Sequence, residues 1–165
     1  MAALVWIPEL NTGIDEIDRQ HRVIVDYINR LDQLRSTRDR QRLGEVIGET
    51  LEYTMSHFIF EESLLEEAGY MFTGPHKKVH EIFTRRVADL QRRFLAGEDI
   101  ADELHSMLSR WLFNHIRSED HAYVATVKTY LRMARSGQGV AKDPNFEDPE
   151  HLRRKKGWVA RLFGN

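Results

Sequence analysis

Hydrophobic and polar residues follow one another along most of the chain with the period of an α-helix. In four segments, apolar side chains and histidines recur at spacings of three and four, which places them on one face of a helix. The alternation that is typical of β-strands is not sustained anywhere. The four series are Ile14, Ile17, His21, Ile24, Ile28 and Leu31; Leu43, Ile47, Leu51, Thr54, His57, Glu61 and Leu65; His76, His80, Phe83, Val87, Leu90 and Phe94; and Ile100, Leu104, Leu108, Trp111 and His115.

Residues that start or stop helices lie between these series. Asn11 and Thr12 precede the first series and are candidate N-terminal caps. Pro75 suits the first turn of the third helix. Gly69 and Gly97 follow the second and third series, where a glycine commonly ends a helix. The sequence therefore predicts four separate helices.

Short connections, at about residues 36–40, 69–74 and 97–99, join the predicted helices. Helices of ~20 residues joined by such short loops must run antiparallel to their neighbours. The predicted fold is all-α: an up-down-up-down antiparallel four-helix bundle with an N-terminal arm and a C-terminal extension. We expect the arm at residues 1–13, the bundle at 14–123 and the extension, with a further helix and a basic tail, at 124–165.

The composition narrows the class of protein. The 165 residues include no cysteine, which excludes disulfides, thiol catalysis and cysteine-ligated metal centres. The formal charge of −2 does not suggest a nucleic-acid binder. The N-terminal residues show no pattern of a secretory signal, and no run approaches the ~20 apolar residues of a membrane span. We therefore expect a cytoplasmic protein.

The last fifteen positions differ in charge from the rest. Residues 151–165 carry five basic and no acidic side chains, interleaved with apolar ones such as Trp158 and Phe163. One interpretation is a solvated, unstructured tail. The alternative hypothesis is a segment that docks on an anionic membrane surface or on a partner protein.

Several positions that should face the bundle core are polar. Burying an unpaired neutral polar group costs ~2–7 kcal/mol, and an unpaired carboxylate costs more. Five imidazoles and carboxylates on the seams of four helices need a common partner, and a metal centre is the simplest one. These residues are His21, His57, Glu61, His76, His80 and His115, with Asp120 beyond them.

The spacing of these residues supports a shared site. His57 and Glu61 are four apart, as are His76 and His80, so each pair points to one side of its helix. Asp120 follows His115 by five, a spacing that diverges by ~140° in a regular α-helix. We therefore predict a π-type irregularity between these two residues. In an up-down bundle, early positions on odd helices and late positions on even helices meet at one end.

The number and type of the candidate ligands indicate the class of metal site. Five histidines and two carboxylates exceed what one ion takes from a protein, so two ions that share bridging carboxylates fit better. Imidazole and carboxylate without sulfur suit iron, and less specifically manganese or zinc. The Glu-x-x-His pairs of ferritin-like sites and the His-Glu-x-x-His motif are both absent from the sequence.

Four motifs follow one another along the chain: Asp18-Arg-Gln-His21, His57-Phe-x-x-Glu61, His76-x-x-x-His80 and His115-x-x-x-x-Asp120. Taken in this order, they resemble the motifs of the hemerythrin family, over about residues 5–123. The segment from Trp6 to Asp15, with its Leu-Asn-Thr-Gly-Ile, is similar to the bacterial branch, the bacteriohemerythrins.

The resemblance implies a non-haem di-iron centre with an oxo or hydroxo bridge. One iron would take His76, His80 and His115, and the other would take His21 and His57. The two carboxylates, Glu61 and Asp120, would bridge the ions. In the family, the two-histidine iron has an open position at which O2 binds reversibly.

Reversible binding of O2 needs a dry pocket. By spacing, the candidate pocket residues are Ile24, Phe58, Trp111, Leu112 and Ile116. Gln20 and Tyr123 are candidates for groups that contact the ligands. The remaining histidines break the seam pattern: we expect His105 and His121 to be exposed and place His151 in the tail.

Three functions from different classes remain. The first is an O2 carrier or store, which is a binding protein and not an enzyme. The second is a sensor of O2 or redox state that signals through the C-terminal extension. The third is a di-iron oxidase, or a scavenger of nitric oxide or peroxide, which would need substrate access and proton delivery.

Overall fold

The computed structural model describes residues 3–37 and 39–137. In this part of the chain the secondary structure is helical and no residue lies in a β-strand. The all-α fold class is therefore confirmed. In chain order the elements are the short 3-10 helix η1 (Pro8–Leu10), α1 (Asp15–Arg35), α2 (Arg40–Glu67), α3 (Thr73–Leu95), α4 (Ala101–His115), the π-helix η2 (Ile116–Asp120) and α5 (His121–Arg135).

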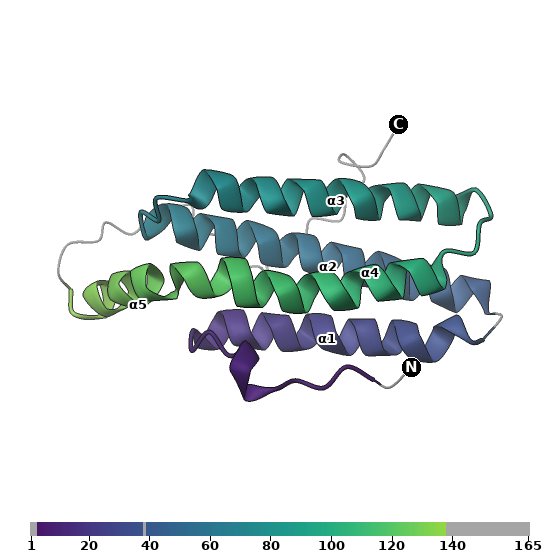
Figure 1. Ribbon diagram of the computed structural model, residues 1–165, viewed down its shortest axis with the longest axis horizontal. Helices are drawn as coiled ribbons and strands as arrows, with labels where there is room; N and C mark the ends of the chain where they lie inside the picture. The colour runs from purple at the N-terminus through teal and green to yellow at the C-terminus, as the bar shows by residue number, and fades with distance from the viewer. Residues whose placement is uncertain (1–2, 38, 138–165) are drawn as a thin grey trace.

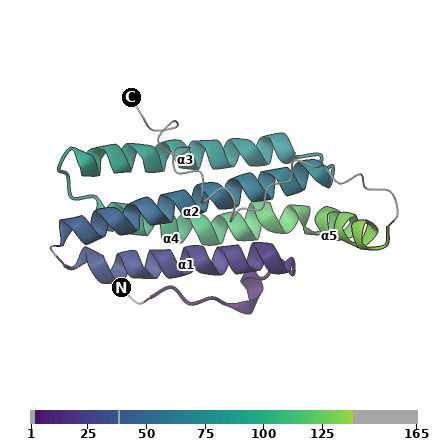
Figure 2. The ribbon, with the colours of Figure 1, turned by 180° about the vertical axis from the view of Figure 1, so that it is seen from behind.

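The four long helices lie side by side with alternating direction (Figures 1 and 2). Helix α1 packs on both α2 and α4, and α3 packs on α2. The segment before α1 runs back along the outside of α1 (Figure 1). This arrangement confirms the predicted up-down-up-down bundle. Helix α5 continues in the direction of α4 (Figure 1). It covers the segment for which we expected a further helix. The predicted basic tail lies outside the described residues.

The start of α1 differs from the prediction, because neither Asn11 nor Thr12 caps the helix. The residue before the first turn is Ile14, whose side chain makes no capping hydrogen bond. Instead, the buried Asp18 accepts hydrogen bonds from the backbone N–H and the hydroxyl of Thr12 and from the N–H of Gly13. Gly13 adopts a φ of 74°, which favours glycine, and this turn fixes the arm against α1.

The predicted irregularity between His115 and Asp120 is confirmed. Helix α4 ends at His115, and the next five residues form the π-helix η2 before α5 begins. The wider turn adds a residue to the helical repeat, which brings Asp120 back to the side of the helix that His115 faces. Asp120 and His115 are both buried, and their oxygen Oδ1 and nitrogen Nε2 lie 3.0 Å apart.

The apolar interior consists of two clusters with the polar side chains between them. On α1, His21 lies between Ile17 of the smaller cluster and Ile24 of the larger one. On α2, Glu61 lies between Phe58 and Leu64 in the same way. The polar residues therefore form a layer across the bundle, with apolar side chains above and below it. We call these seven side chains the polar layer: His21, His57, Glu61, His76, His80, His115 and Asp120.

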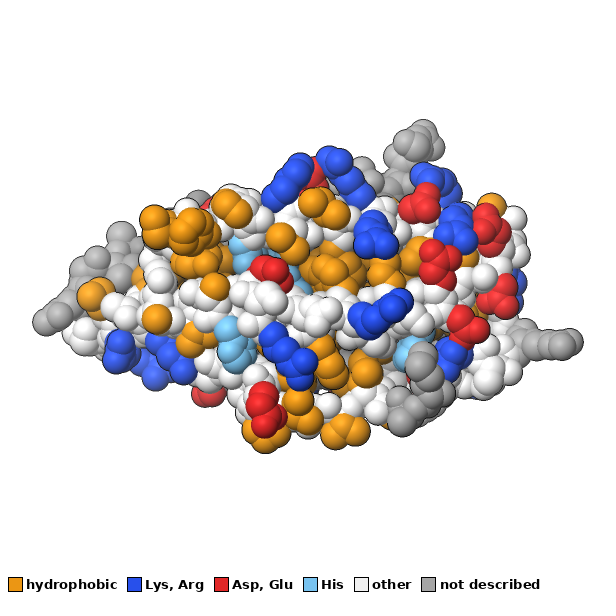
Figure 3. Space-filling view, viewed as in Figure 1, with side chains coloured by type: hydrophobic (Ala, Val, Ile, Leu, Met, Phe, Trp, Pro, Cys, Tyr) orange, Lys and Arg blue, Asp and Glu red, His pale blue; other side chains and the backbone are white. Residues whose placement is uncertain are grey.

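The surface agrees with a bundle whose seams are apolar. In the space-filling view, hydrophobic side chains line the seam between α3 and α4, and histidine atoms are visible at its left end (Figure 3). At this seam, the ring of Phe83 on α3 stacks on Trp111 of α4 at a centroid distance of 3.8 Å. Within the described ranges, no helix combines the length and the apolar character needed to cross a membrane.

His105 is buried, so the expectation that it is exposed was wrong. It lies on the flank of α4 that faces α1, where its Nε2 is 3.6 Å from Oδ1 of Asp32. Only 2% of its surface is exposed, and neither ring nitrogen makes a hydrogen bond within residues 3–37 and 39–137. A helix in a bundle buries a wider stripe than the single seam used for the prediction. His121 is exposed, as expected.

Candidate metal centre

Five histidines and two carboxylates from all four bundle helices and η2 meet in the polar layer. The position of each follows from the up-down order, because His21 and His76 lie early in α1 and α3, while His57 and His115 lie late in α2 and α4. All seven side chains are at most 4% exposed. The sequence-predicted residues are thus brought together at one level of the bundle, as their heights along the helices predict.

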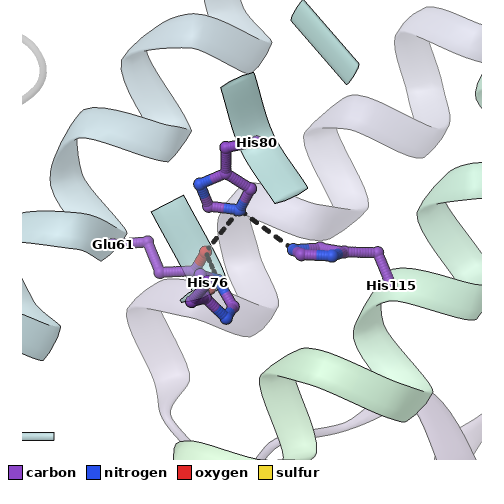
Figure 4. Close-up of side chains that lie close together, drawn as sticks. All are labelled: Glu61, His76, His80 and His115. Carbon is purple, nitrogen blue, oxygen red and sulfur yellow. Dashed lines mark hydrogen bonds and ion pairs between the residues drawn. The ribbon is translucent and has the colours of Figure 1, made fainter. Parts of the chain in front are cut away.

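Three histidines and Glu61 form one compact group (Figure 4). The Nε2 atoms of His76 and His80 lie 3.0 and 3.2 Å from Oε2 of Glu61. The Nε2 atoms of His80 and His115 are 3.0 Å apart. In this group one donor atom from each of the four residues lies within 4.8 Å of the others, so one metal ion could contact all of them.

Glu61 also belongs to a second group, with His21 and His57. Asp120 lies between the two groups: its Oδ2 is 3.2 Å from Nε2 of His21, and its Oδ1 is 3.0 Å from Nε2 of His115. Glu61 therefore lies close to histidines of both groups, and Asp120 stands between the two groups. This is the arrangement expected of carboxylates that bridge two ions.

Several atoms of the polar layer have no hydrogen-bond partner among the described residues. The fully buried atoms without such a partner include both ring nitrogens of His21 and both carboxylate oxygens of Asp120. Leaving a buried donor or acceptor without a partner costs about 1–3 kcal/mol, and more for a charged group. Nitrogen and oxygen donors that converge in a buried layer fit a cation, and this donor set suits a transition metal of the iron–zinc series.

Three of the histidines in the layer, His57, His80 and His115, have a partner for the imidazole nitrogen that faces away from it. Nδ1 of His57 is 2.8 Å from Oε1 of Gln20, which was among the predicted contacting groups. Nδ1 of His80 is 2.8 Å from Oε1 of Glu62, and Nδ1 of His115 is 3.1 Å from Oε2 of Glu119. Such outer hydrogen bonds fix the orientation of ligating imidazoles. Sequence reasoning missed both glutamates, although Glu119 follows His115 at the spacing of one helical turn.

Tyr123, the other predicted contacting group, donates a hydrogen bond from its hydroxyl to Oε1 of Glu61. Burial raises the pKa of the Tyr123 hydroxyl well above its usual range, and the negative charge of Glu61 adds to this effect. Burial would also raise the pKa of Glu61, but hydrogen bonds from His76 and His80 outweigh it and hold that pKa well below the usual range. Glu61 is thus an ionised carboxylate with a neutral phenol beside it.

The histidines of the layer differ in their affinity for protons. Burial, together with repulsion from His21, lowers the pKa of His57 to about 3. Burial would lower the pKa of His80 as well, but hydrogen bonds with Glu61 and Glu62 outweigh it and raise the pKa to about 9. A cation that binds among these groups must therefore displace a proton from His80 but none from His57.

Apolar and aromatic side chains surround the polar layer. Ile24, Leu112 and Ile116 are at most 3% exposed and belong to the larger apolar cluster. Phe58 stacks on His80 at a centroid distance of 3.8 Å, and the partly buried Trp111 stacks on His115 at 4.3 Å. The two aromatic residues of the predicted pocket therefore lie against the three-histidine group, whereas Ile24 lies one turn from His21.

The N-terminal arm contributes a residue that sequence reasoning did not place at the site. The ring centroid of Trp6 is 6.3 Å from that of His21, and the Arg22 guanidinium lies over the indole. The indole N–H donates a hydrogen bond to Oδ1 of Asn11. Trp6 thus covers the outer side of the two-histidine group.

A four-helix bundle with a buried layer of histidines and carboxylates defines a class: metal-binding bundle proteins with nitrogen and oxygen ligands. The family model described as "Hemerythrin HHE cation binding domain" matches residues 12–127. The chain belongs to the hemerythrin family.

Individual relatives and solved structures agree with this assignment. The chain is 58% identical over 131 residues to a bacteriohemerythrin of Stenotrophomonas maltophilia, a match that covers 79% of this chain and 86% of the relative. It is 32% identical to a bacteriohemerythrin of Methylococcus capsulatus over 125 residues, 74% of this chain and 95% of the relative. A crystal structure of wild-type hemerythrin superposes with a TM-score of 0.74 at 30% identity, covering 76% of this chain and 98% of that one.

Proposed function

We propose that the polar layer holds two iron ions and that the protein binds O2 reversibly, as a carrier or store. The observation that carries the proposal is the convergence of five imidazoles and two carboxylates in a buried layer, where several donor atoms make no hydrogen bond among the described residues. Membership of the hemerythrin family and the names of the bacterial relatives support it. When bound, the pair of ferrous ions would supply the two electrons that O2 takes up on binding and returns on release.

The seven side chains would divide between two metal positions. His76, His80 and His115 would hold one ion, and His21 and His57 the other, with Glu61 and Asp120 shared. The distances between the donor atoms support this division, since the compact three-histidine group and the two-histidine group meet at Glu61. The position with two histidines would have fewer protein ligands and would therefore be the one with room for O2.

The apolar residues around the layer would exclude water. Ile24, Leu112 and Ile116 are candidates for the walls of the O2 pocket because they are buried and lie within a turn of the ligands. Phe58 and Trp111 would shield the three-histidine position, on which they stack. Exclusion of water and of anions slows the loss of electrons from reduced iron, which reversible binding requires.

The environment of Tyr123 favours a carrier over an enzyme that reduces O2. Complete reduction of O2 needs protons, and the hydroxyl that touches the layer belongs to Tyr123. Its raised pKa means that this hydroxyl keeps its proton at neutral pH and serves as a hydrogen-bond donor to Glu61. Tyr123 would thus hold the bridging carboxylate in place and would not deliver a proton to bound O2.

Two measurements test this function. Metal analysis of the purified protein should find about two iron ions per chain. Stopped-flow mixing of the reduced protein with O2 should give a stable adduct that loses O2 again under argon. Rapid decay to the oxidised form with consumption of peroxide would instead indicate an enzyme. A large change in protease sensitivity of the C-terminal extension on oxygenation would indicate a sensor.

A further inference from the structure

The two metal positions differ in the groups that accept hydrogen bonds from their histidines. At the three-histidine position, the outward nitrogens of His80 and His115 face carboxylates, those of Glu62 and Glu119. At the two-histidine position, the outward nitrogen of His57 faces the neutral amide oxygen of Gln20. The pattern is therefore charged acceptors on one side of the site and a neutral acceptor on the other.

The neutral acceptor is held in place by its own partners. The Gln20 amide donates from Nε2 to Oε1 of Glu16 at 2.6 Å, which turns its oxygen toward His57. Glu16 is in turn paired with Arg19, also at 2.6 Å, so its charge is compensated at the surface. The other histidine of this position, His21, has no hydrogen-bond partner for Nδ1 in the part of the chain that the structure describes.

The charged acceptors contact their histidines directly, but they are more exposed than Gln20, which is 2% exposed. The Glu62 side chain is 23% exposed and lies 2.8 Å from His80, with the Lys77 ammonium 3.8 Å from its second oxygen. The Glu119 side chain is 37% exposed and lies 3.1 Å from His115. Of the two, Glu62 should therefore act more strongly on its histidine, because water screens it less.

An imidazole that donates its N–H to a carboxylate becomes a more basic ligand. A more basic ligand stabilises the ion of higher charge more than the ion of lower charge. We propose that Glu62 and Glu119 are positioning residues that favour ferric iron at the three-histidine position, so that a half-reduced centre keeps its ferrous ion at the two-histidine position. This inference rests on the proposed di-iron centre. The outer carboxylates, Glu62 and Glu119, would thereby set the order in which the two ions are reduced by one electron each.

The test is a redox titration of the iron-loaded protein without O2, followed by absorption and electron paramagnetic resonance. The double variant Glu62→Gln with Glu119→Gln should raise the potential of the second reduction. A tenfold change in the preference for ferric over ferrous iron corresponds to about 59 mV for one electron. We expect a shift of roughly this size, and a smaller one for Glu119→Gln alone.

Two further variants separate this effect from a general change of charge. Gln20→Glu combined with Glu16→Gln keeps the net charge and gives His57 a charged acceptor, so it should lower the potential of the first reduction. Glu66→Gln is the matched control, because Glu66 also pairs with Lys77 near the site but contacts no histidine of the layer. Equal shifts for Glu66→Gln and Glu62→Gln, or no shift for Glu62→Gln, would overturn the proposal.

A measurement on the unmodified protein keeps the proposal testable if a variant fails to load iron. In zinc-loaded protein, the Nδ1 protons of His80 and His115 should resonate further downfield than that of His57 in proton NMR, because they bond to carboxylates. Similar shifts for all three protons would also overturn it. Failure of reversible O2 binding would contradict the proposed function, but the potentials, which are measured without O2, would still decide this inference.

Discussion

The hydrogen bond between Tyr123 and Glu61 can be removed with almost no change in packing, because Tyr123→Phe deletes only the hydroxyl. Tyr123 is fully buried, and its ring packs against His76 at a centroid distance of 5.6 Å. The variant keeps this ring contact but leaves one oxygen of an ionised, buried carboxylate without its donor.

The expected cost follows from the burial and the charge of the acceptor. A hydrogen bond to a charged group contributes about 1.5–3 kcal/mol. For a chain of this size, 1 kcal/mol shifts the melting temperature by roughly 2–4 °C. Tyr123→Phe should therefore lower the melting temperature of the metal-free protein by several degrees and its free energy of unfolding by ~2 kcal/mol.

The chain contains a matched control for this substitution. Tyr130 lies on the same helix, and its hydroxyl donates to Oε2 of Glu67 on α2 at 2.6 Å, but this contact is exposed. Exposed contacts with a charged group contribute about 0–1 kcal/mol. Guanidinium unfolding of both variants at pH 7 gives the comparison. If Tyr123→Phe and Tyr130→Phe lost the same stability, the argument from burial would be refuted.

Three further substitutions test the ligands, the pocket and a buried histidine. Glu61→Ala removes the carboxylate that both groups share, so iron analysis should find fewer than two ions per chain; two ions with an unchanged spectrum would contradict the ligand set. Leu112→Ala opens a space beside the site and should speed autoxidation, at a cost in stability of about 3–5 kcal/mol; an unchanged autoxidation rate would remove Leu112 from the pocket. His105→Leu should stabilise the protein, and more so at pH 5 than at pH 8. Burial lowers the pKa of His105 below its ordinary 6.5, so the stability that its neutral form contributes is present above pH 6.5 and is lost as the pH falls below it. An equal gain at both pH values would show that His105 does not titrate on unfolding in this range.

The helices and the polar layer could be predicted from the sequence because both depend on local spacing. Histidines such as His76 and His80 share a helix face whatever the rest of the chain does. Even the π-helix followed from the five-residue step between His115 and Asp120, which no regular helix accommodates. Family resemblance then supplied the division into two metal positions, which geometry alone left open.

The features that sequence missed depend on contacts between helices or on how far a helix is buried. His105 lies outside the seam that was read as the core, and only the packing of α4 on α1 buries it beside Asp32. Glu62 was not predicted at the site because its neighbour Glu61 occupies the apolar seam. In the structure, the Glu62 carboxylate nevertheless contacts His80 on the next helix. Asn11 and Thr12 were wrongly predicted as caps of α1 because Asp18, inside the helix, accepts the hydrogen bonds of the preceding turn.

The position of the polar layer has a consequence for folding. The layer separates a large apolar cluster from a small one, which consists of Ile14, Ile17, Leu64, Leu65, Tyr123 and Val127. Without metal, the side chains between the small cluster and the rest of the interior are buried histidines and carboxylates, several of whose atoms make no hydrogen bond among the described residues. Two ions in the layer would link all four helices at this level. Metal loading would then decide whether the bundle unfolds as one cooperative unit or opens first at that end.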